Sequence, residues 1–273
     1  MTVSEHTPVQ VTDTFVDHPQ GRLFVRSWHP ALAAQGEAGE TPVLLLHDSL
    51  GCVELWREFP AALAQTLGRR VIAYDRLGFG RSDPRGGALA PDFIEEEARI
   101  VLPALQRELD FHRFIAFGHS VGGGMAVHCA ALHPDACAAL VTESAQAFVE
   151  ERTRAGIREA KAAFADPAQF ERLARYHGDK ARWVLDAWTE TWLGPAFATW
   201  SLEGVLPRVR CPLLALHGEH DEFGSVRHPE MLGRLAAGGA RVEIIAGAYH
   251  VPHREQAARV VRHVRGFLAA LHL

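Results

Sequence analysis

The chain has 273 residues, of which 48% are hydrophobic and 22% charged, and its formal net charge is −5. This composition is typical of a globular protein with a sizeable core, and the charge gives no reason to expect nucleic acid or an anionic membrane as a partner. No apolar run reaches the roughly 18 residues of a membrane span, and the polar first ten residues predict no secretory signal. We therefore expect a cytoplasmic protein.

Cysteine and histidine spacing gives no sign of a metal site. No C-x-x-C pair occurs, which predicts reduced core residues rather than disulfides or metal ligands at Cys52, Cys129, Cys137 and Cys211. The 16 histidines include no H-E-x-x-H spacing. The sequence thus predicts neither a metal nor an organic cofactor.

Strands and helices alternate in the first half of the chain. Apolar or β-branched runs predict strands at residues 15–17, 22–28, 42–47, 70–75, 114–117 and 138–142. Helical patterns follow at residues 60–67, 92–109 and 125–132. Such alternation favours right-handed βαβ units, and therefore a mostly parallel sheet with flanking helices.

The alternation stops and then resumes. Residues 144–202 have helical character and no convincing strand, whereas strands are predicted at 212–217 and 241–245 and helices at 229–237 and 255–271. A helical insert between two strands of one sheet lies at the carboxyl edge, where ligands bind in open α/β folds. We interpret residues 144–202 as a lid after the sixth strand, and residues 1–143 and 203–273 as the core domain.

One segment organises the chain. Residues 114–117 form a buried strand, and Gly118-His119-Ser120-Val121-Gly122, which fits G-x-S-x-G, leads directly into a helix. A sharp strand-to-helix turn exposes its central serine, and glycines let neighbouring backbone pass. This context identifies Ser120 as a candidate nucleophile.

A serine hydroxyl needs a base, and the base needs an acid to orient it. Asp221 and His250 each come just after a predicted strand, at the edge that also holds Ser120. Their order along the chain, serine then acid then histidine, is that of the α/β-hydrolase arrangement. The N–H of Val121, directly after the serine, is expected to stabilise an oxyanion.

These motifs together resemble the α/β-hydrolase superfamily over residues 15–143 and 203–271. The resemblance includes G-x-S-x-G, the Asp75-x-x-Gly78-x-Gly80-x-Ser82 loop, a His-Gly-like loop that begins at His47, and the Gly218-x-x-Asp221 and His250 segments. It implies the α/β-hydrolase fold and, by position, Ser49 as the second oxyanion donor. Asp48 departs from the pattern, because a glycine usually follows the histidine of this loop.

The resemblance also ranks the rival residues. Asp221 is preferred to Glu222 because its offset from Gly218 matches the family, while Glu143 is a second rival because related enzymes sometimes place the acid there. His250 is preferred to His253, one helical turn further on, because it lies at the strand end.

We expect hydrolysis of a small or moderately apolar carboxylic ester through an acyl-enzyme. The alternatives with the same serine are a carbon–carbon bond hydrolase, a lactonase, an amidase, a perhydrolase or a lyase, and a non-enzymatic ligand receptor is the alternative from another class. An expected partner is a small-molecule substrate, bound by a monomer or homodimer. Lid tryptophans are candidate pocket residues, namely Trp183, Trp188 and Trp192.

Overall fold

An eight-stranded sheet forms the centre of the protein, for which a computed structural model describes residues 9–31 and 41–273. The expectation about the chain's start concerns residues 1–10, of which residues 1–8 lie outside the described residues. The strands are β1 (Gln10–His18), β2 (Gly21–His29), β3 (Val43–Leu46), β4 (Val71–Tyr74), β5 (Phe114–His119), β6 (Cys137–Glu143), β7 (Leu213–Gly218) and β8 (Ala240–Ile245).

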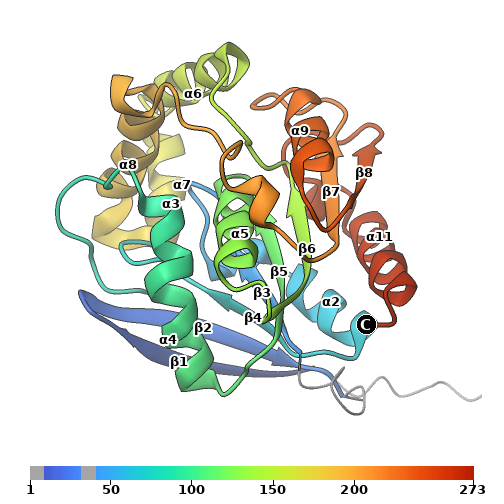
Figure 1. Cartoon of the computed structure of the whole chain (residues 1–273). Coiled ribbons are helices and arrows are strands. Elements are labelled where there is room, and N and C mark those ends of the chain that lie inside the picture. Colours follow the sequence, from blue (N-terminus) through green and yellow to red (C-terminus); the bar gives the residue numbers. More distant parts are fainter. Residues whose placement is uncertain (1–8, 32–40) are drawn as a thin grey trace, which may run out of the picture.

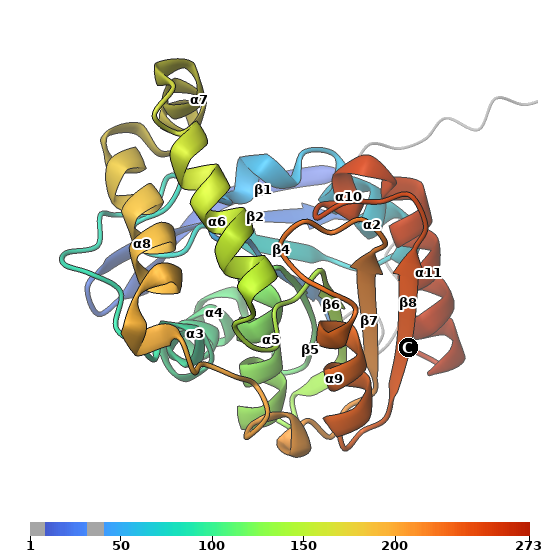
Figure 2. The same ribbon diagram turned by 90° about the horizontal axis from the view of Figure 1, so that it is seen from above.

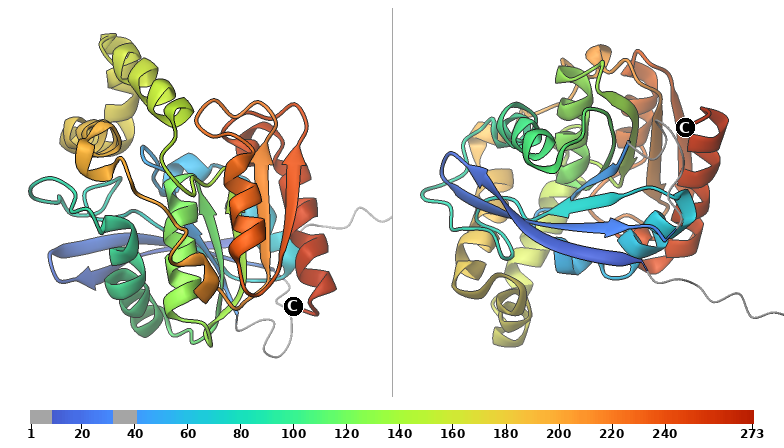
Figure 3. Two further views of the ribbon diagram at one scale, coloured as in Figure 1. Left: turned by 45° about the horizontal axis from the view of Figure 1, so that its top comes forward. Right: turned by 90° about the horizontal axis from the view of Figure 1, so that it is seen from below.

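The order across the sheet is β1-β2-β4-β3-β5-β6-β7-β8. Only β2 runs against the rest, because it pairs antiparallel with both β1 and β4, while every other pair is parallel. Figure 3 shows the long β1–β2 ribbon at one edge and β8 at the other. The mostly parallel sheet predicted from the sequence is confirmed.

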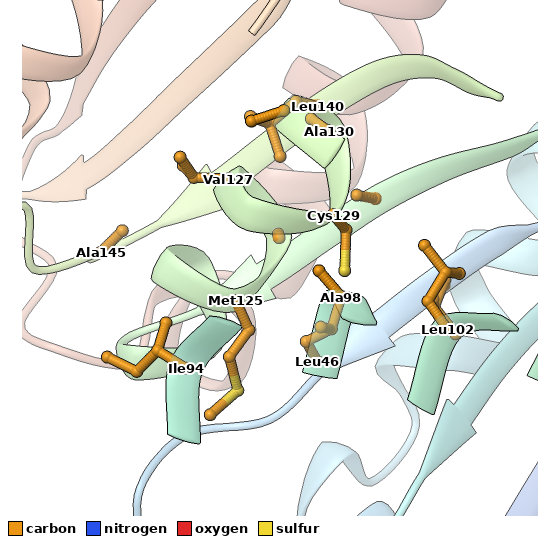
Figure 4. Packing of buried hydrophobic residues seen from close by; sticks show 14 of the residues in the cluster. Leu46, Ile94, Ala98, Leu102, Met125, Val127, Cys129, Ala130, Leu140 and Ala145 are labelled. Carbon is orange, nitrogen blue, oxygen red and sulfur yellow. The ribbon is translucent and has the colours of Figure 1, made fainter. Parts of the chain in front are cut away.

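Alternate side chains of the buried strands face two separate cores. Val43 and Leu45 pack on the side covered by α2 (Phe59–Leu67) and α11 (Ala257–Ala270). Leu44 and Leu46 pack on the opposite side with the other helices, which are α3 (Phe93–Glu96), α4 (Leu102–Leu109), α5 (Val121–Leu132) and α9 (Arg227–Leu235). Figure 4 shows α5 at the centre of this second core, with Met125 beside Ile94. Because both faces are buried, these strands read as unbroken apolar runs.

Two predicted elements differ in detail. The single helix expected at 92–109 contains the π-helical turn η2 (Glu97–Val101) between α3 and α4. Strand β1 is nine residues long, well beyond the run predicted at 15–17, whereas β2 extends its predicted run by one residue at each end. Most of β1 is exposed, so backbone pairing with β2 rather than an apolar pattern determines its length.

Three helices lie between β6 and β7, at the edge where the parallel strands end (Figure 1). They are α6 (Glu151–Ala163), α7 (Pro167–His177) and α8 (Ala181–Leu193). Figure 2, the view from above, shows α6 crossing this edge between α8 and α9. Phe79 joins their small core with Leu173, Ala181, Val184 and Leu185. The interpretation of this insert as a lid stays a prediction.

Short elements complete the chain. They are the 3-10 turns η1 (Val53–Trp56), η3 (Gly178–Lys180), η4 (Pro195–Phe197) and η5 (Leu206–Arg208), and the helix α10 (Pro252–Glu255). All four cysteines are buried and free. In the described part of the chain, no helix combines the length and apolar character that crossing a membrane requires.

Candidate active site

The turn between β5 and α5 holds Ser120 in a strained backbone conformation. Its φ is 57° and its ψ is −125°, a region that residues other than glycine rarely occupy. A Cβ on Gly122 would lie 2.1 Å from the carbonyl oxygen of Leu46, and one on Gly118 would lie 2.1 Å from that of Gly122. Glycine at both positions therefore allows the tight turn that presents Ser120 at its apex.

The imidazole of His250 lies between Ser120 and Asp221. Its Nε2 is 3.0 Å from Ser120 Oγ, and its Nδ1 is 2.9 Å from Asp221 Oδ1. When the carboxylate accepts the Nδ1 proton, Nε2 is left to accept the proton of the serine hydroxyl. Because Asp221 follows β7 and His250 follows β8, the carboxyl ends of the strands bring the three predicted side chains together.

The pKa values of Asp221 and His250 are shifted in opposite directions. Burial acts to raise the pKa of Asp221, but the charge of His250 and the hydrogen bond with it, together with the Phe223 N–H, hold this pKa at about 2. Burial acts to lower the pKa of His250, and nearby carboxylates outweigh it so that the net shift is upward: Asp221 first, then Glu222 and Asp48. An ionised carboxylate thus supports a more basic imidazole.

The loop after β3 has a defined path despite the non-glycine residue at Asp48. The carbonyl oxygen of Asp48 lies 2.8 Å from His47 Nδ1 and accepts hydrogen bonds from Arg76 Nη2 at 2.8 Å and the Gly51 N–H at 3.2 Å. Across the same trans peptide, the N–H of Ser49 points away from these groups. Ser49 lines the cavity beside Ser120.

Val121 is the first residue of α5, so its N–H has no partner within the helix. Val121 directly follows the candidate nucleophile Ser120, and the positive end of the helix dipole lies at the same point. The positions of Val121 and Ser49 are thus compatible with two oxyanion donors, although their role in catalysis stays a prediction.

Gln146 is a neighbour of the nucleophile that the sequence analysis missed. Its side-chain oxygen Oε1 lies 3.1 Å from Ser120 Oγ, where it accepts a hydrogen bond from the hydroxyl, and the residue is buried in the segment after β6. A side-chain amide can present oxygen or NH₂, and with NH₂ toward Oγ the serine keeps its proton for His250. No motif marks this residue, because only the path of the chain from β6 to α6 brings it to Ser120.

A cavity of about 170 Å³ opens beside Ser120. Its apolar walls come largely from the insert, through Ile157 of α6 and Trp188 and Trp192 of α8. Phe223, from the loop after β7, completes the wall, and its ring centroid is 4.8 Å from that of His250.

Trp183 does not line this cavity, which corrects its prediction as a pocket residue. Its ring packs on Phe79 with centroids 5.5 Å apart, and its Nε1 donates a hydrogen bond of 2.7 Å to the carbonyl oxygen of Gly87. The first turn of α8 therefore faces the loop after β4, whereas Trp188 and Trp192, further along the helix, face Ser120.

The insert contacts the loop that carries the acid. Thr153 Oγ1 of α6 donates a hydrogen bond of 2.7 Å to the carbonyl oxygen of Phe223. A Cβ on Gly156, one turn further along α6, would lie 3.0 Å from the Phe223 ring. Helix α6 is thus packed closely against the residues that follow Asp221.

The rival residues form a second pair behind the first. His253 Nδ1 lies 2.5 Å from Glu143 Oε2, and His119 Nε2 lies 2.9 Å from the carbonyl oxygen of His250. In the described part of the chain, His119, Glu143 and His253 are the group whose ligand atoms, all within 4.8 Å of one another, could hold a metal ion. These hydrogen bonds already engage one ring nitrogen of each histidine, so we treat the group as a buried hydrogen-bonded network.

Comparison with known proteins bears on the family and the fold. The family model described as "alpha/beta hydrolase fold" matches residues 41–179. The chain is similar to the mouse serine hydrolase BPHL, with 28% identity over 277 residues, which covers 97% of this chain and 91% of that protein. It is also similar to the 2-hydroxymuconate semialdehyde hydrolase of Pseudomonas sp. (strain CF600), with 34% identity over 96 residues, or 34% of this chain and 32% of that protein.

Among solved structures, a proline iminopeptidase of Mycobacterium smegmatis has a TM-score of 0.74 and 22% identity, covering 95% of this chain and 98% of that one. This likeness concerns the fold. Some curated relatives are matched over only about a third of their length, at 32% for each of two. The relatives named here differ in the bond they cleave, so they support hydrolase chemistry without specifying the bond.

Proposed function

This chain belongs to the α/β-hydrolase-fold family, and on that premise we propose that it is a serine hydrolase that cleaves carboxylic esters through an acyl-enzyme. The observation that carries the proposal is the alignment of Ser120 Oγ, His250 and Asp221, with hydrogen bonds of 3.0 Å and 2.9 Å. The same constellation recurs in hydrolases of unrelated fold, where geometry rather than sequence position defines it.

The mechanism follows from these distances. His250 Nε2 accepts the Ser120 proton as Oγ attacks the acyl carbonyl, and Asp221 stabilises the imidazolium that forms. The N–H groups of Val121 and Ser49 stabilise the tetrahedral oxyanion. His250 then protonates the leaving alcohol and, in the second half, activates a water molecule that releases the acid.

The cavity supports a small, partly apolar substrate. Its aromatic and aliphatic walls suit an apolar group, and its position under α6 and α8 makes these helices the lid that admits the substrate. An ester is the least demanding acyl donor for such a site, because an alcohol leaves more readily than an amine. The free cysteines are consistent with action in the reducing cytoplasm.

The test is hydrolysis of a p-nitrophenyl ester series together with labelling by a fluorophosphonate, with Ser120→Ala in parallel. We expect labelling of the native protein only, and a loss of turnover in the variant of about five to six orders of magnitude. Folded native protein that neither reacts with the probe nor turns over any ester would contradict the proposal and favour a ligand receptor. Labelling without ester turnover would move the assignment to another bond, and the semialdehyde cleaved by the Pseudomonas relative would be tested next.

A further inference from the structure

The hydroxyl of Ser120 has two hydrogen-bonding neighbours in the described part of the chain, but it has only one proton to donate. His250 Nε2 lies 3.0 Å from Oγ, and Gln146 Oε1 lies 3.1 Å from it. We propose that Gln146 is a further catalytic residue, whose amide turns with the charge of His250 and donates an N–H to Ser120 Oγ when the imidazole is neutral. This inference rests on the proposed serine hydrolase function and adds a group at its nucleophile.

A neutral His250 does not fit an amide that presents its oxygen to Ser120. The Nδ1 proton of His250 goes to Asp221, so Nε2 can only accept, and Gln146 Oε1 can also only accept. Whichever of the two takes the serine proton, the other faces a lone pair of Oγ. Turning the amide removes this conflict, because an N–H of Gln146 then donates to Oγ and the serine proton goes to Nε2.

A protonated His250 requires the opposite orientation of the amide. Its Nε2–H donates to Ser120 Oγ, and the serine proton then needs an acceptor, which Gln146 Oε1 provides. An NH₂ group in that place would leave the serine proton without an acceptor. The orientation with Oε1 toward Oγ therefore belongs with the imidazolium, and the turned orientation belongs with the neutral, reactive imidazole.

The amide of Gln146 is free to turn, although the residue is only 3% exposed. Its Nε2 forms no hydrogen bond with a described residue, and Gln146 lines the cavity beside Ser120. The neighbouring backbone is fixed, because the Ala147 N–H donates to His228 Nδ1 at 3.0 Å and the Ala147 carbonyl accepts the Leu202 N–H at 2.7 Å. Half a turn about the last side-chain bond exchanges oxygen and NH₂, which are similar in size, so it needs no other movement.

An N–H at Ser120 Oγ assists both halves of the proposed reaction. In acylation the serine proton passes to His250 Nε2 as Oγ bonds to the acyl carbon, and a donor at Oγ stabilises the negative charge that develops there. In deacylation the bond between Oγ and the acyl carbon breaks, its electron pair returns to Oγ, and His250 supplies the proton. The same N–H of Gln146 then stabilises Oγ as the leaving atom.

Other charged groups near His250 set the pH at which its charge changes. The carboxylates near the ring or its loop are Asp221, Glu222, Asp48, Glu143 and Glu255. The other titratable or charged groups there are His119, His217, His253 and Arg254, and the insert adds no charged residue to the described cavity lining. None of these groups forms a hydrogen bond with Ser120 Oγ, so Gln146 alone among the described neighbours responds to the imidazole at the nucleophile.

Three side chains of equal length test the role of position 146. Methionine offers no donor and only a weak acceptor, and ionised glutamate only accepts. We expect Gln146→Met to lower kcat/KM for p-nitrophenyl acetate and the rate of fluorophosphonate labelling by about tenfold or more. The rise of kcat/KM with pH should stay within about 0.5 unit of the native value, because this variant loses one hydrogen bond in each charge state of His250.

Gln146→Glu should differ from Gln146→Met in its pH profile. An ionised carboxylate stabilises the imidazolium and holds the serine proton away from His250, so the rise should move to higher pH by about one unit or more. Gln65→Met is the matched control, since Gln65 is exposed on α2 and does not line the cavity, and its kinetics should match those of the native protein.

NMR of the native protein with ¹⁵N-labelled glutamine tests the turn of the amide without a substitution. The NH₂ signal of Gln146 is identified by its response to fluorophosphonate labelling of Ser120. It should shift with pH, with the same midpoint as the rise of kcat/KM. A signal that stays constant across that rise would overturn the proposal, and this measurement decides the matter if the variants do not fold.

The outcomes separate this inference from the function on which it rests. Folded Gln146→Met with native kcat/KM and native labelling would overturn the role of Gln146 and leave the serine hydrolase intact. A loss in KM alone would also overturn it, because the residue would then act on substrate binding and not on Oγ. Native protein that neither hydrolyses an ester nor reacts with the probe would instead show that the proposed function itself fails, and this inference with it.

Discussion

Two acid–histidine pairs lie on either side of the His119 ring in this protein, and they differ in charge. Asp221 pairs with His250 beside Ser120, and Glu143 pairs with His253 directly behind them. The pKa of Asp221 is held at about 2, whereas burial raises that of Glu143 to about 7. The pKa of His250 is shifted upward, while burial lowers that of His253 to about 3.

The charge of His250 and the hydrogen bonds to Asp221 explain the difference better than burial, because both acids are almost completely buried. Asp221 Oδ1 accepts the N–H groups of Phe223 and Gly224 at 2.8 and 3.0 Å, which stabilise its ionised form. Glu143 Oε1 has no partner among the described residues. A carboxyl group and an imidazole therefore form an ionised acid with a more basic histidine in one place, and in the other a pair that is uncharged below about pH 7.

The largest expected effect separates the pairs by activity. Asp221→Asn should lower kcat by about four orders of magnitude, because the amide stabilises the wrong imidazole tautomer. Glu143→Gln should lower it by less than about tenfold when measured below about pH 6.5, since a neutral amide then replaces a carboxyl group that is mostly protonated. Steady-state kinetics on one ester tests both, and a similar loss in the two variants would mean that both pairs take part in catalysis.

The second effect concerns stability. Because the pKa of Glu143 is higher in the folded state, folding favours its protonated form, and stability is lost as pH rises from about 4.5 to about 7. Relative to Glu143→Gln, the native protein should lose up to roughly 3 kcal/mol over this range. Urea unfolding of both proteins as a function of pH measures it. A difference that is constant with pH would show that Glu143 is ionised in the folded protein throughout.

The third prediction tests the contact between the pairs. His119→Phe removes the Nε2 donor to the His250 carbonyl and should cost about 1–3 kcal/mol of stability, because the carbonyl is left unpaired in the interior. The displaced His250 loop should also lower kcat several-fold. His112→Phe, at an exposed histidine, is the control in the same unfolding and kinetic measurements. Unchanged stability in His119→Phe would show that the contact contributes little.

The smallest expected effect is a shift in the pH profile. His250 must be neutral to accept a proton, so kcat/KM should rise with pH through its pKa, which lies above 6.5. In Glu222→Gln this rise should move to lower pH by up to about one unit, because a charge that stabilises the imidazolium is lost. A profile measured with a neutral ester tests this, and a shift to higher pH would contradict it.

The sequence predicted the elements that local pattern controls. Apolar runs located the buried strands, and G-x-S-x-G located the turn at Ser120. Its glycines are needed because a Cβ at either position would collide with nearby backbone. The structure also brings Asp221 and His250 to Ser120, as their places after two strands indicated. These signals lie within short segments, so one sequence is enough to read them.

Other features depend on contacts between distant segments. Nothing near Gln146 predicts that it reaches Ser120, and nothing in α8 distinguishes Trp183 from Trp192 before the insert is packed. The pairing of Glu143 with His253 joins residues 110 positions apart, and sequence spacing offered both only as rivals of the residues at the site. Side-chain direction and desolvation decide these cases.

The hydrogen bond from Thr153 to the Phe223 carbonyl has a consequence for how the insert can be exchanged. A transplanted insert that lacks a hydroxyl at this place would leave a peptide oxygen unsatisfied two residues beyond Asp221. Substrate scope and the alignment of the acid are therefore not separable modules in this chain. A designer who replaces residues 144–202 should retain Thr153 and Gly156 as an adaptor, and diversify the helix faces beyond them.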